Sequence, residues 1–472
     1  MYLVYKNKNG KWAVKEEGKK RACKVCDSKV EAIAYATKRA AEEKTIFKVE
    51  GDSTGTKKHK ALWIILLIIL LVIIAVLGYM YATGKLNLSF LNPSEPPTEE
   101  PEDQKPENNV GVKYDGFQMH FLELGNKYTG DSTYIKAGDV DILIDAGSRV
   151  GSASTIINYV DKYCTDGKLE YVIATHGDQD HIAGMYGTKS NGKYNGILYN
   201  YEIGTIIYNN LTNKTTTTYS NFIDAVNYAK SNGAIVLTAA DCYNNSNGGS
   251  RSFILDEEKN ITMDILYNYF YFNKSSDENN YSVCTMFNYG NEHHFMMTGD
   301  LELHGEEKMA EYYNGSSSEK TLPQVDLFKA GHHGSKTSSN ECLLSIIKPK
   351  IVTVCCCAGG SEYTANYNNV FPTQDFITRV AKYTDAIYVT SYYDEKALAF
   401  KPMNGNIIIS CNGSDVGVFA TNNTTKLKDT VWFNETVYVD SKNNICSGSG
   451  KEDFFTENSP GVKAVPRRVW PS

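Results

Sequence analysis

Residues 174–184 read Ala-Thr-His-Gly-Asp-Gln-Asp-His-Ile-Ala-Gly, and they follow directly on a short apolar run, Tyr-Val-Ile at 171–173. Within six positions this stretch carries two imidazoles and two carboxylates, those of His176, Asp178, Asp180 and His181. A loop that leaves a strand can turn four such side chains toward one point, and this mixture of ligands suits zinc, manganese or iron. The stretch therefore predicts a two-metal site. The alternative is a solvated acidic turn that happens to contain histidines.

The composition of the chain is that of an ordinary globular protein. Its 472 residues are enough for two or three domains, and 42% of them are hydrophobic and 22% charged. Nine of the eleven cysteines follow residue 82. Because nine is odd and the run Cys355 to Cys357 lies in a strand-like segment of small buried residues, no disulfide pattern is predicted.

Residues 61–82 are predicted to cross a membrane. They contain no charged residue, and 22 residues of helix are enough to span a hydrocarbon layer of about 30 Å. Lys57, Lys58 and Lys60 precede this span and only Lys85 follows closely, so the N-terminus is expected in the cytoplasm. Residues 1–60 carry 16 basic and 8 acidic side chains, which leaves 32 basic and 47 acidic in the remainder. The large acidic part, with the metal motif, is therefore expected to be extracellular, on a single-pass protein of the cell membrane.

Residues 1–55 are predicted to form a small ββαβ domain. A hairpin pattern at 2–5 and 12–14 precedes a helix at 28–43, with Ser28 as N-cap and Glu31 completing a capping box, and a strand at 46–49 closes the sheet. The segment resembles a short bacterial domain of unknown function, a resemblance that implies no chemistry, and its cytoplasmic partner is unknown. Its lone Cys-x-x-Cys pair lacks two further ligands nearby.

The rest of the chain divides into three segments. Residues 85–111 are rich in Pro and Glu and are expected to form an extended, self-repelling linker. Residues 112–413 mix short apolar strands with helices, which predicts an α/β (α+β) domain of layered αββα type. Residues 414–472 form a C-terminal extension whose last residues, from 466, are expected to be disordered rather than a docking element.

Four further segments accompany the first motif in chain order. They are Phe-Leu-Glu-Leu-Gly at 121–125 with Gly-Asp-Ser at 130–132 and Leu-Ile-Asp-Ala-Gly at 143–147, Asn-Asn-Tyr-Ser-Val at 279–283, Met-Met-Thr-Gly-Asp-Leu-Glu at 296–302, and Phe-Lys-Ala-Gly-His-His-Gly-Ser-Lys-Thr-Ser-Ser at 328–339. In this order they resemble the metallo-β-lactamase fold. Within that superfamily, residues 115–413 are most similar to the soluble domain of the ComEC-type competence DNA-uptake proteins. The similarity lies in Asp178 in place of a usual second His, in the Thr-Gly-Asp-Leu-Glu run and in the His-His-Gly-Ser run. Glu123 departs from the common Asp, and the many-helix channel of those proteins is absent.

The resemblance implies a set of metal ligands. It assigns His176 and Asp178 to a first ion, and Asp180, His181 and one of His332 or His333 to a second, with Asp300 bridging both. A further superfamily His has no clear counterpart, since His293 and His294 fall in a strand-like run and read as surface residues. His120, in the first strand, is also predicted to be a surface histidine. With fewer nitrogen ligands and more oxygen ligands, Mn²⁺ rivals Zn²⁺ for the two sites.

Two cations about 3.5–4 Å apart lower the pKa of a bridging water, which makes hydroxide the expected nucleophile. Asp180 is placed to orient it, and whichever of His332 and His333 is not a ligand could protonate a leaving oxygen. Lys336, with the hydroxyls beside it, would suit a phosphate, although a plain surface lysine is an equal alternative.

The first hypothesis is therefore a membrane-anchored phosphodiesterase that acts on DNA. The alternatives are a hydrolase of another ester, such as a phosphocholine ester or a lactam, and a sensor without catalytic activity. The acidic outer part works against broad attraction to nucleic acid and favours the second hypothesis slightly.

Overall fold

The computed structural model describes residues 2–49 and 116–471, except for 8, 9, 17, 20, 27, 43–46, 191, 315–320, 362, 396 and 447–460. The chain divides into two compact units, Met1–Asp103 and Gln104–Ser472. Within the described residues no helix has the length and apolar character that a membrane span requires. The predicted span at 61–82 and the predicted linker at 85–111 lie outside the described residues.

The N-terminal unit is a four-stranded sheet with one helix. Its elements are β1 (Tyr2–Lys6), β2 (Trp12–Glu16), β3 (Lys24–Cys26), α1 (Lys29–Glu42) and β4 (Phe47–Val49), with the strands in the order β3-β2-β1-β4. The hairpin, the helix and the closing strand lie where the sequence predicts them, and the Ser28 hydroxyl accepts a hydrogen bond from the Glu31 amide at 3.1 Å. The sequence missed β3, in which only Cys26 is buried, so the strand shows no apolar pattern.

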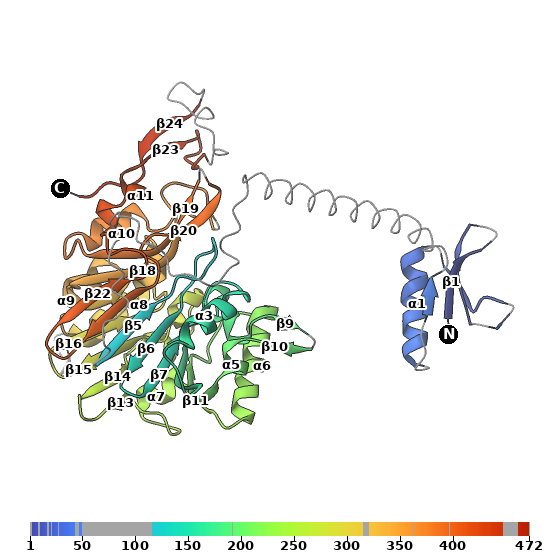
Figure 1. The fold of residues 1–472 in the computed structure, drawn as a ribbon, viewed down its shortest axis with the longest axis horizontal. Coiled ribbons are helices and arrows are strands. Elements are labelled where there is room, and N and C mark those ends of the chain that lie inside the picture. The colour runs from blue at the N-terminus through green and yellow to red at the C-terminus, as the bar shows by residue number, and fades with distance from the viewer. Residues whose placement is uncertain are drawn as a thin grey trace, which may run out of the picture. The chain divides into compact units, whose positions relative to one another are not determined.

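The second unit contains two mixed sheets of eight strands each among its described residues (Figure 1). The first has the order β12-β11-β8-β7-β6-β5-β21-β22 and the second β13-β14-β15-β16-β17-β18-β19-β20. The strands of the first sheet are β5 (Phe117–Phe121), β6 (Thr133–Ala137), β7 (Val140–Ile144), β8 (Lys168–Ala174), β11 (Glu202–Tyr208), β12 (Ile235–Thr238), β21 (Ile407–Cys411) and β22 (Val416–Ala420). Those of the second are β13 (Ser252–Asp256), β14 (Ile261–Ile265), β15 (Thr285–Tyr289), β16 (His293–Met297), β17 (Leu327–Lys329), β18 (Ile351–Ala358), β19 (Ile387–Asp394) and β20 (Ala399–Pro402).

Helices cover the outer face of each sheet, so the predicted αββα sandwich is confirmed for the described residues. The first sheet packs under α3 (Ser152–Val160), α4 (Gln179–Tyr186), α5 (Ile197–Asn200) and α6 (Thr217–Ser231). The second packs under α8 (Leu303–Asn314), α9 (Glu341–Ile347), α10 (Gln374–Val380) and α11 (Val431–Asn434). A short helix, α7 (Ala239–Asn244), contributes to the layer between the sheets.

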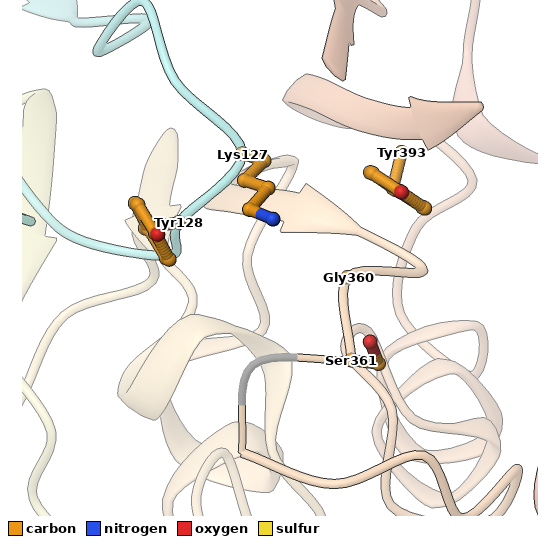
Figure 2. Close-up of a pocket in the computed structure, with 5 residues that line it drawn as sticks. All are labelled: Lys127, Tyr128, Gly360, Ser361 and Tyr393. Carbon is orange, nitrogen blue, oxygen red and sulfur yellow. The ribbon is translucent and has the colours of Figure 1, made fainter. Parts of the chain in front are cut away.

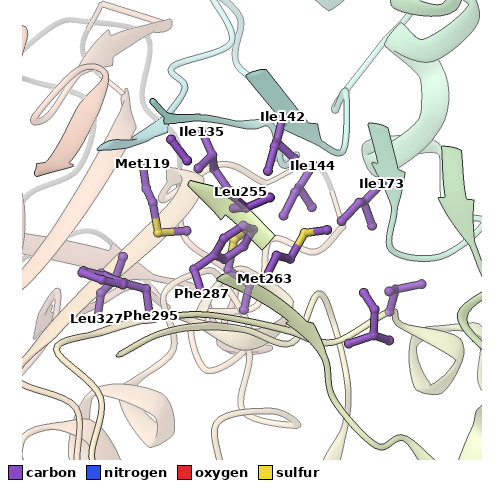
Figure 3. Close-up of a cluster of buried hydrophobic side chains, with 14 of the residues drawn as sticks. Met119, Ile135, Ile142, Ile144, Ile173, Leu255, Met263, Phe287, Phe295 and Leu327 are labelled. Atoms are coloured by element: carbon purple, nitrogen blue, oxygen red, sulfur yellow. The ribbon is translucent and has the colours of Figure 1, made fainter. Parts of the chain in front are cut away.

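The core between the sheets consists of large apolar side chains from both inner faces. Met119, Ile135 and Ile173 from the first sheet meet Met263 and Phe287 from the second (Figure 3). Fully buried side chains of this size are the main source of stability in such a sandwich, at roughly 1.5–3 kcal/mol each. None of the eleven cysteines, all of which are described, forms a disulfide, so this packing holds the sheets together without crosslinks.

Two sequence predictions about this unit are wrong. The boundary at residue 413 falls inside a hairpin, because β22 pairs antiparallel with β21 and extends the first sheet to Ala420. His120 is not on the surface but fully buried beneath α3, where its Nδ1 lies 2.8 Å from the Tyr159 hydroxyl and its Nε2 lies 3.0 Å from the Gln118 amide oxygen. Burial lowers the pKa of His120 to about 3, so the ring is neutral.

The C-terminal tail is ordered against the second unit, which contradicts the predicted disorder. Strand β24 (Lys463–Pro466) pairs with β23 (Thr436–Val439), and the Arg467 guanidinium forms a two-pronged ion pair with Glu395 at 2.8 Å. The neighbouring Arg468 is buried and donates hydrogen bonds to the carbonyls of Val370 at 2.6 Å and Pro372 at 2.8 Å. The sequence could not show this, because the acceptors lie almost a hundred residues away from the arginine.

Replacing Arg468 with Ala should lower the free energy of unfolding of the second unit by about 3 kcal/mol, because buried carbonyls lose a charged donor. The measurement is urea denaturation of the detergent-solubilised chain, followed by the fluorescence of Trp432, whose ring lies 6.0 Å from the Arg468 guanidinium. The matched control is Lys463→Ala, an exposed change on β24 that should cost under about 0.5 kcal/mol. Equal stability of the two variants would show that the tail contacts are dispensable.

Candidate metal centre

The predicted ligands follow the carboxyl ends of strands from both sheets. His176 comes two residues after β8, Asp300 three after β16, and His332 and His333 follow β17. Strands β16, β17 and β18 run parallel, as do β7 and β8, so within each sheet these ends meet at one edge. Helix α4 begins within the first motif, with Asp178 at its N-cap, and this places Asp180 and His181 in the first helical turn.

Four side chains form a buried cluster whose ligand atoms all lie within 4.8 Å of one another: Asp131, His181, Asp300 and His333. The Asp300 carboxylate is central, since its Oδ2 lies 3.2 Å from His181 Nε2 and 3.3 Å from His333 Nε2. Asp180 joins this group through its Oδ2, which is 3.3 Å from His333 Nε2. The structure thus brings together the residues that the sequence assigns to the second ion, with His333 as the histidine of the pair.

The two imidazoles of the cluster, those of His181 and His333, are each fixed by a hydrogen bond at Nδ1. His181 Nδ1 lies 2.7 Å from Asp145 Oδ2, and the same carboxylate accepts hydrogen bonds from the amide and hydroxyl of Thr175, both at 2.8 Å. His333 Nδ1 donates to the Cys355 carbonyl at 2.8 Å. A histidine whose Nδ1 proton is bound in this way presents its Nε2 lone pair to a metal, as ligand histidines usually do.

The residues assigned to the first ion form a neighbouring pair. His176 Nε2 lies 3.5 Å from Asp178 Oδ2, and the His176 and His181 ring centroids are 4.2 Å apart. Asp178 also forms an ion pair with Lys214, which follows β11. The pair is therefore adjacent to the buried cluster without belonging to it.

His332 lies at the rim rather than in the cluster. Its side chain is 24% exposed and its Nε2 is 4.0 Å from Asp300 Oδ2. Its Nδ1 lies 3.1 Å from Glu302 Oε1 and 3.2 Å from the Thr337 hydroxyl. Burial alone would raise the pKa of Glu302, but hydrogen bonds with His332, Thr337 and Asp277 outweigh burial and lower it to about 2. Glu302 is consequently ionised at neutral pH and orients the His332 ring.

The backbone of the turn between Gly331 and Gly334 explains how adjacent histidines reach different positions. His332 and His333 both adopt left-handed conformations, with φ of 45° and 54°. This conformation costs roughly 1–2 kcal/mol for each non-glycine residue. The two rings leave the turn in different directions, one into the cluster and one to its rim.

Sequence reasoning did not assign Asp131 or Lys329 to the site, although both lie in or beside the cluster. Lys329, in β17, is fully buried; its ammonium forms an ion pair with Asp131 and lies 3.9 Å from Asp300 Oδ1. Burial would lower the pKa of Lys329, but the carboxylates of Asp131 and Asp300 raise it well above its usual value, so the side chain stays charged. The available signal was a lysine in an otherwise apolar strand that leads into the His-His pair.

Two aromatic residues from the loop between β18 and α10 cover the cluster. The Tyr363 hydroxyl donates to Asp180 Oδ2 at 2.5 Å, and its ring lies 5.9 Å from that of Phe371. The Phe371 ring is 5.6 Å from His332 and 6.0 Å from His333. Arg468 donates hydrogen bonds to the carbonyls on either side of Phe371, so the C-terminal tail helps to fix the loop that carries Phe371.

Other candidates from the sequence lie apart from the cluster. Lys336 is exposed, and its ammonium has no ion-pair partner among the described residues. The hydroxyls beside it are already bonded within the protein, Ser335 to Thr337 at 2.9 Å and Thr337 to Glu302 at 2.9 Å. His293 and His294 stand at the opposite end of β16, where they contact Asp326 at 3.1 Å and Asn288 at 2.8 Å.

The motif at 279–283 supports the cluster through hydrogen bonds. The Ser282 hydroxyl accepts a hydrogen bond from the Asp300 amide at 3.0 Å and donates to the Asn279 carbonyl at 2.7 Å. It also lies 3.5 Å from His176 Nδ1. This segment therefore positions two predicted ligands, and it supplies no imidazole of its own.

The cluster fits a divalent metal. Among the described residues, the buried atoms His176 Nε2, Asp300 Oδ1 and His333 Nε2 have no hydrogen-bond partner, so each is available as a ligand. Burial alone would lower the pKa of both His181 and His333, but the carboxylates around them hold both pKa values well above the usual range. The site thus already stabilises positive charge, and mixed nitrogen and oxygen ligands suit Zn²⁺ or Mn²⁺.

The detergent-solubilised chain should bind divalent metal through these residues, and the double variant Asp180→Ala, His181→Ala should lose at least one ion per chain. Metal content after dialysis, measured by mass spectrometry, tests this, with the exposed His304→Ala as matched control. Affinity should fall as the pH is lowered, because the pKa of His181 and that of His333 are raised and both rings must lose a proton to bind metal. Unchanged metal content in the double variant would show that the ions bind elsewhere.

Comparison with solved structures finds matches of low similarity. The metallo-beta-lactamase fold protein YhfI from Bacillus subtilis is 11% identical with a TM-score of 0.33, and the match covers 58% of this chain and 95% of that one. A putative metal-dependent hydrolase from Parabacteroides distasonis is 12% identical with a TM-score of 0.24, covering 47% of this chain and 76% of that one. Scores this low do not specify a function.

Sequence comparison identifies two domains. Recombination protein 2 of Haemophilus influenzae is 37% identical over 59 residues, which are 12% of this chain and only 6% of that protein. Residues 2–60 match a family described as an uncharacterized protein conserved in bacteria, DUF2188. Residues 125–209, which contain Asp131, Asp145 and the motif at 174–184, match the metallo-beta-lactamase superfamily. Together with the buried donor cluster, this match indicates a metal-dependent hydrolase whose chain resembles DUF2188 over residues 2–60 and the metallo-beta-lactamase superfamily over residues 125–209.

Proposed function

We propose that this protein is a phosphodiesterase that cleaves DNA with the help of two divalent ions, Zn²⁺ or Mn²⁺, and that residues 61–82 anchor it in the cell membrane. The observation that carries the proposal is the convergence of Asp180, Asp300 and His333 on one buried point, with a separate histidine, His332, at its rim. This arrangement supplies metal ligands and a candidate proton donor side by side.

The side chains of the cluster would hold the ions and keep their surroundings rigid. His181 and His333 would bind through Nε2, because their Nδ1 atoms are held by Asp145 and the Cys355 carbonyl. Asp300 lies between these two imidazoles and would hold an ion together with them. When bound, two divalent ions activate water and stabilise charge on both the attacking and the leaving oxygen.

His332 is the proposed general acid. Its Nδ1 is fixed by Glu302 and Thr337, which leaves Nε2 directed toward the cluster, 4.0 Å from Asp300 Oδ2. The ionised Glu302 supports the positive charge that the ring carries when both nitrogens are protonated. The proton on Nε2 would pass to the leaving oxygen as the P–O bond breaks, and the ring would recover a proton from water.

Several features favour a phosphodiester over a lactam or a neutral ester. Two lysines come from segments beside the candidate ligands: Lys214 is paired to Asp178, and Lys336 is exposed in the segment that follows His332 and His333. The resemblance of the 176–181 and 328–339 motifs to the competence proteins points to DNA, and the relative matched over 59 residues is named for recombination, a process of DNA. Phosphate oxygens can also be neutralised directly by the ions, so the acidic surface is not an obstacle at the site itself.

The role of His332 can be separated from that of the ions by the choice of leaving group. With Mn²⁺ or Zn²⁺, the detergent-solubilised chain should cleave single-stranded DNA and bis-p-nitrophenyl phosphate. Replacing His332 with Ala should reduce DNA cleavage about 100-fold, the usual effect of losing a general acid, yet reduce cleavage of the nitrophenyl ester less than about 5-fold because nitrophenolate leaves without a proton. Initial rates measured for both substrates test this.

Asp180→Ala should abolish both activities, and His304→Ala, an exposed histidine on α8, should leave both unchanged. Equal losses of the two substrates in the His332 variant would exclude its role as an acid. Failure of the unaltered protein to cleave either substrate with either metal would overturn the proposed phosphodiesterase function and favour a sensor.

The proposed topology places the N-terminal domain in the cytoplasm, with an unknown partner there, and the catalytic domain outside the cell. Its basis is the excess of lysine before residues 61–82 and the acidic remainder. Alkaline phosphatase fused after residue 110 should be active, because this enzyme requires export, whereas a fusion after residue 55 should be inactive. The reverse pattern would place the catalytic domain in the cytoplasm.

A further inference from the structure

A hollow of about 240 Å³ lies among the described residues, lined by Lys127, Tyr128, Gly360, Ser361 and Tyr393. Figure 2 shows the Lys127 side chain between the two tyrosines, with its ammonium directed into the space that they enclose. Two phenol rings, an ammonium and a hydroxyl therefore face one small volume. The hollow is smaller than the roughly 300–1,000 Å³ of a site for a whole drug-sized ligand, so it suits one part of a larger substrate.

The segments that line the hollow on its two sides are close in sequence to residues of the metal cluster. Tyr128 is three residues before Asp131, and a chain advances at most about 3.6 Å per residue, so the two Cα atoms lie within about 11 Å. Ser361 is two residues before Tyr363, whose hydroxyl donates to Asp180. The hollow is therefore lined by residues that are close neighbours in sequence of residues at the cluster.

The charge of the hollow suits a phosphate. No carboxylate among the described residues lies within ion-pair distance of the Lys127 ammonium, which is 5.7 Å from the Tyr128 ring centroid. The Arg149 guanidinium lies 4.2 Å from the same centroid and is itself held by the Ser148 carbonyl at 2.7 Å. Two cations thus stand close to the one aromatic ring that forms this wall of the hollow.

We propose that this hollow binds the nucleotide next to the cleaved phosphate, with its base against Tyr128 and Tyr393 and its phosphate at Lys127. This inference rests on the proposed phosphodiesterase function and specifies its substrate. Bases stack on aromatic side chains only when they are free of a duplex, where each base is already stacked and paired. The enzyme should accordingly prefer single-stranded DNA or frayed ends over intact duplex.

Binding of fluorescein-labelled (dT)₁₂ to the detergent-solubilised full chain, followed by fluorescence anisotropy, tests the site without relying on catalysis. Tyr128→Ala should weaken binding about 10-fold, within the range for loss of one base–aromatic stack. Tyr128→Phe keeps the ring and should bind like the unaltered protein, which excludes misfolding as the cause. Lys127→Ala should weaken binding and lower the slope of log Kd against log salt by about 0.7, the value for one phosphate of a single strand.

The matched controls are Tyr228→Ala and Lys230→Ala on α6, which should bind (dT)₁₂ as before. A labelled strand of abasic sites separates stacking from charge. The unaltered protein should bind it about 10-fold more weakly than (dT)₁₂, and Tyr128→Ala should have no further effect. Equal affinity for the abasic strand and (dT)₁₂, or wild-type affinity of the Tyr128→Ala and Lys127→Ala variants for (dT)₁₂, would overturn the inference.

Cleavage of bis-p-nitrophenyl phosphate, which has no base, distinguishes failure of this inference from failure of the proposed function. If Tyr128→Ala cleaves that ester at the normal rate and loses activity on single-stranded DNA, both proposals are supported. If the variant keeps full activity on both substrates, the phosphodiesterase stands and the nucleotide site is wrong. If the unaltered protein binds (dT)₁₂ through Tyr128 but cleaves neither substrate, the site stands as a binding site and the proposed catalysis is wrong.

Discussion

Three buried aspartates, Asp131, Asp145 and Asp300, meet the imidazoles of His181 and His333 in one small volume, and the rest of the domain is arranged around this concentration of charge. Burying carboxylates away from water is costly unless cations or hydrogen bonds compensate them. Lys329 neutralises Asp131, while backbone and hydroxyl donors satisfy Asp145. Asp300 keeps one oxygen without a hydrogen-bond partner among the described residues, and that oxygen is where a metal ion would complete the balance of charge.

The fold holds this site from three directions. Strands of both sheets end at the site, and helix α4 fixes Asp180 and His181 within one turn. The loop before α10 places Tyr363 against Asp180 and Phe371 against His332. The last of these depends on the C-terminal tail, because Arg468 binds the carbonyls next to Phe371. A segment that looks dispensable in sequence therefore takes part in shaping the entrance, and changes in it should affect substrate access as well as stability.

The sequence predicted much of this arrangement but not its internal supports. The spacing of His176, Asp178, Asp180 and His181, with the two later segments, identified most of the side chains that the structure brings together, since candidate ligands lie in short motifs. It left open which of His332 and His333 enters the cluster, because that depends on two left-handed backbone conformations in one turn. It also missed Lys329, because a charged side chain is rarely expected inside a buried strand. It missed Tyr363 because a single aromatic residue in a loop belongs to no sequence pattern that would indicate a role. The contact between Arg468 and its acceptors could not be predicted either, because it joins residues almost a hundred positions apart in the sequence.

The acidic character of the chain after residue 60 is compatible with the proposed polyanionic substrate once distance is considered. At physiological salt, charges more than about 8 Å apart are largely screened from each other, so net charge governs approach more than contact. Some of the negative charge belongs to the linker at 85–111, and some to the cluster itself, where metal ions would neutralise it. The cation proposed here to contact a phosphate directly is Lys127, which lines the hollow. Such a protein gains little from the long-range attraction that draws duplex-binding proteins to DNA, and it is better suited to hold a flexible single strand by a few local contacts.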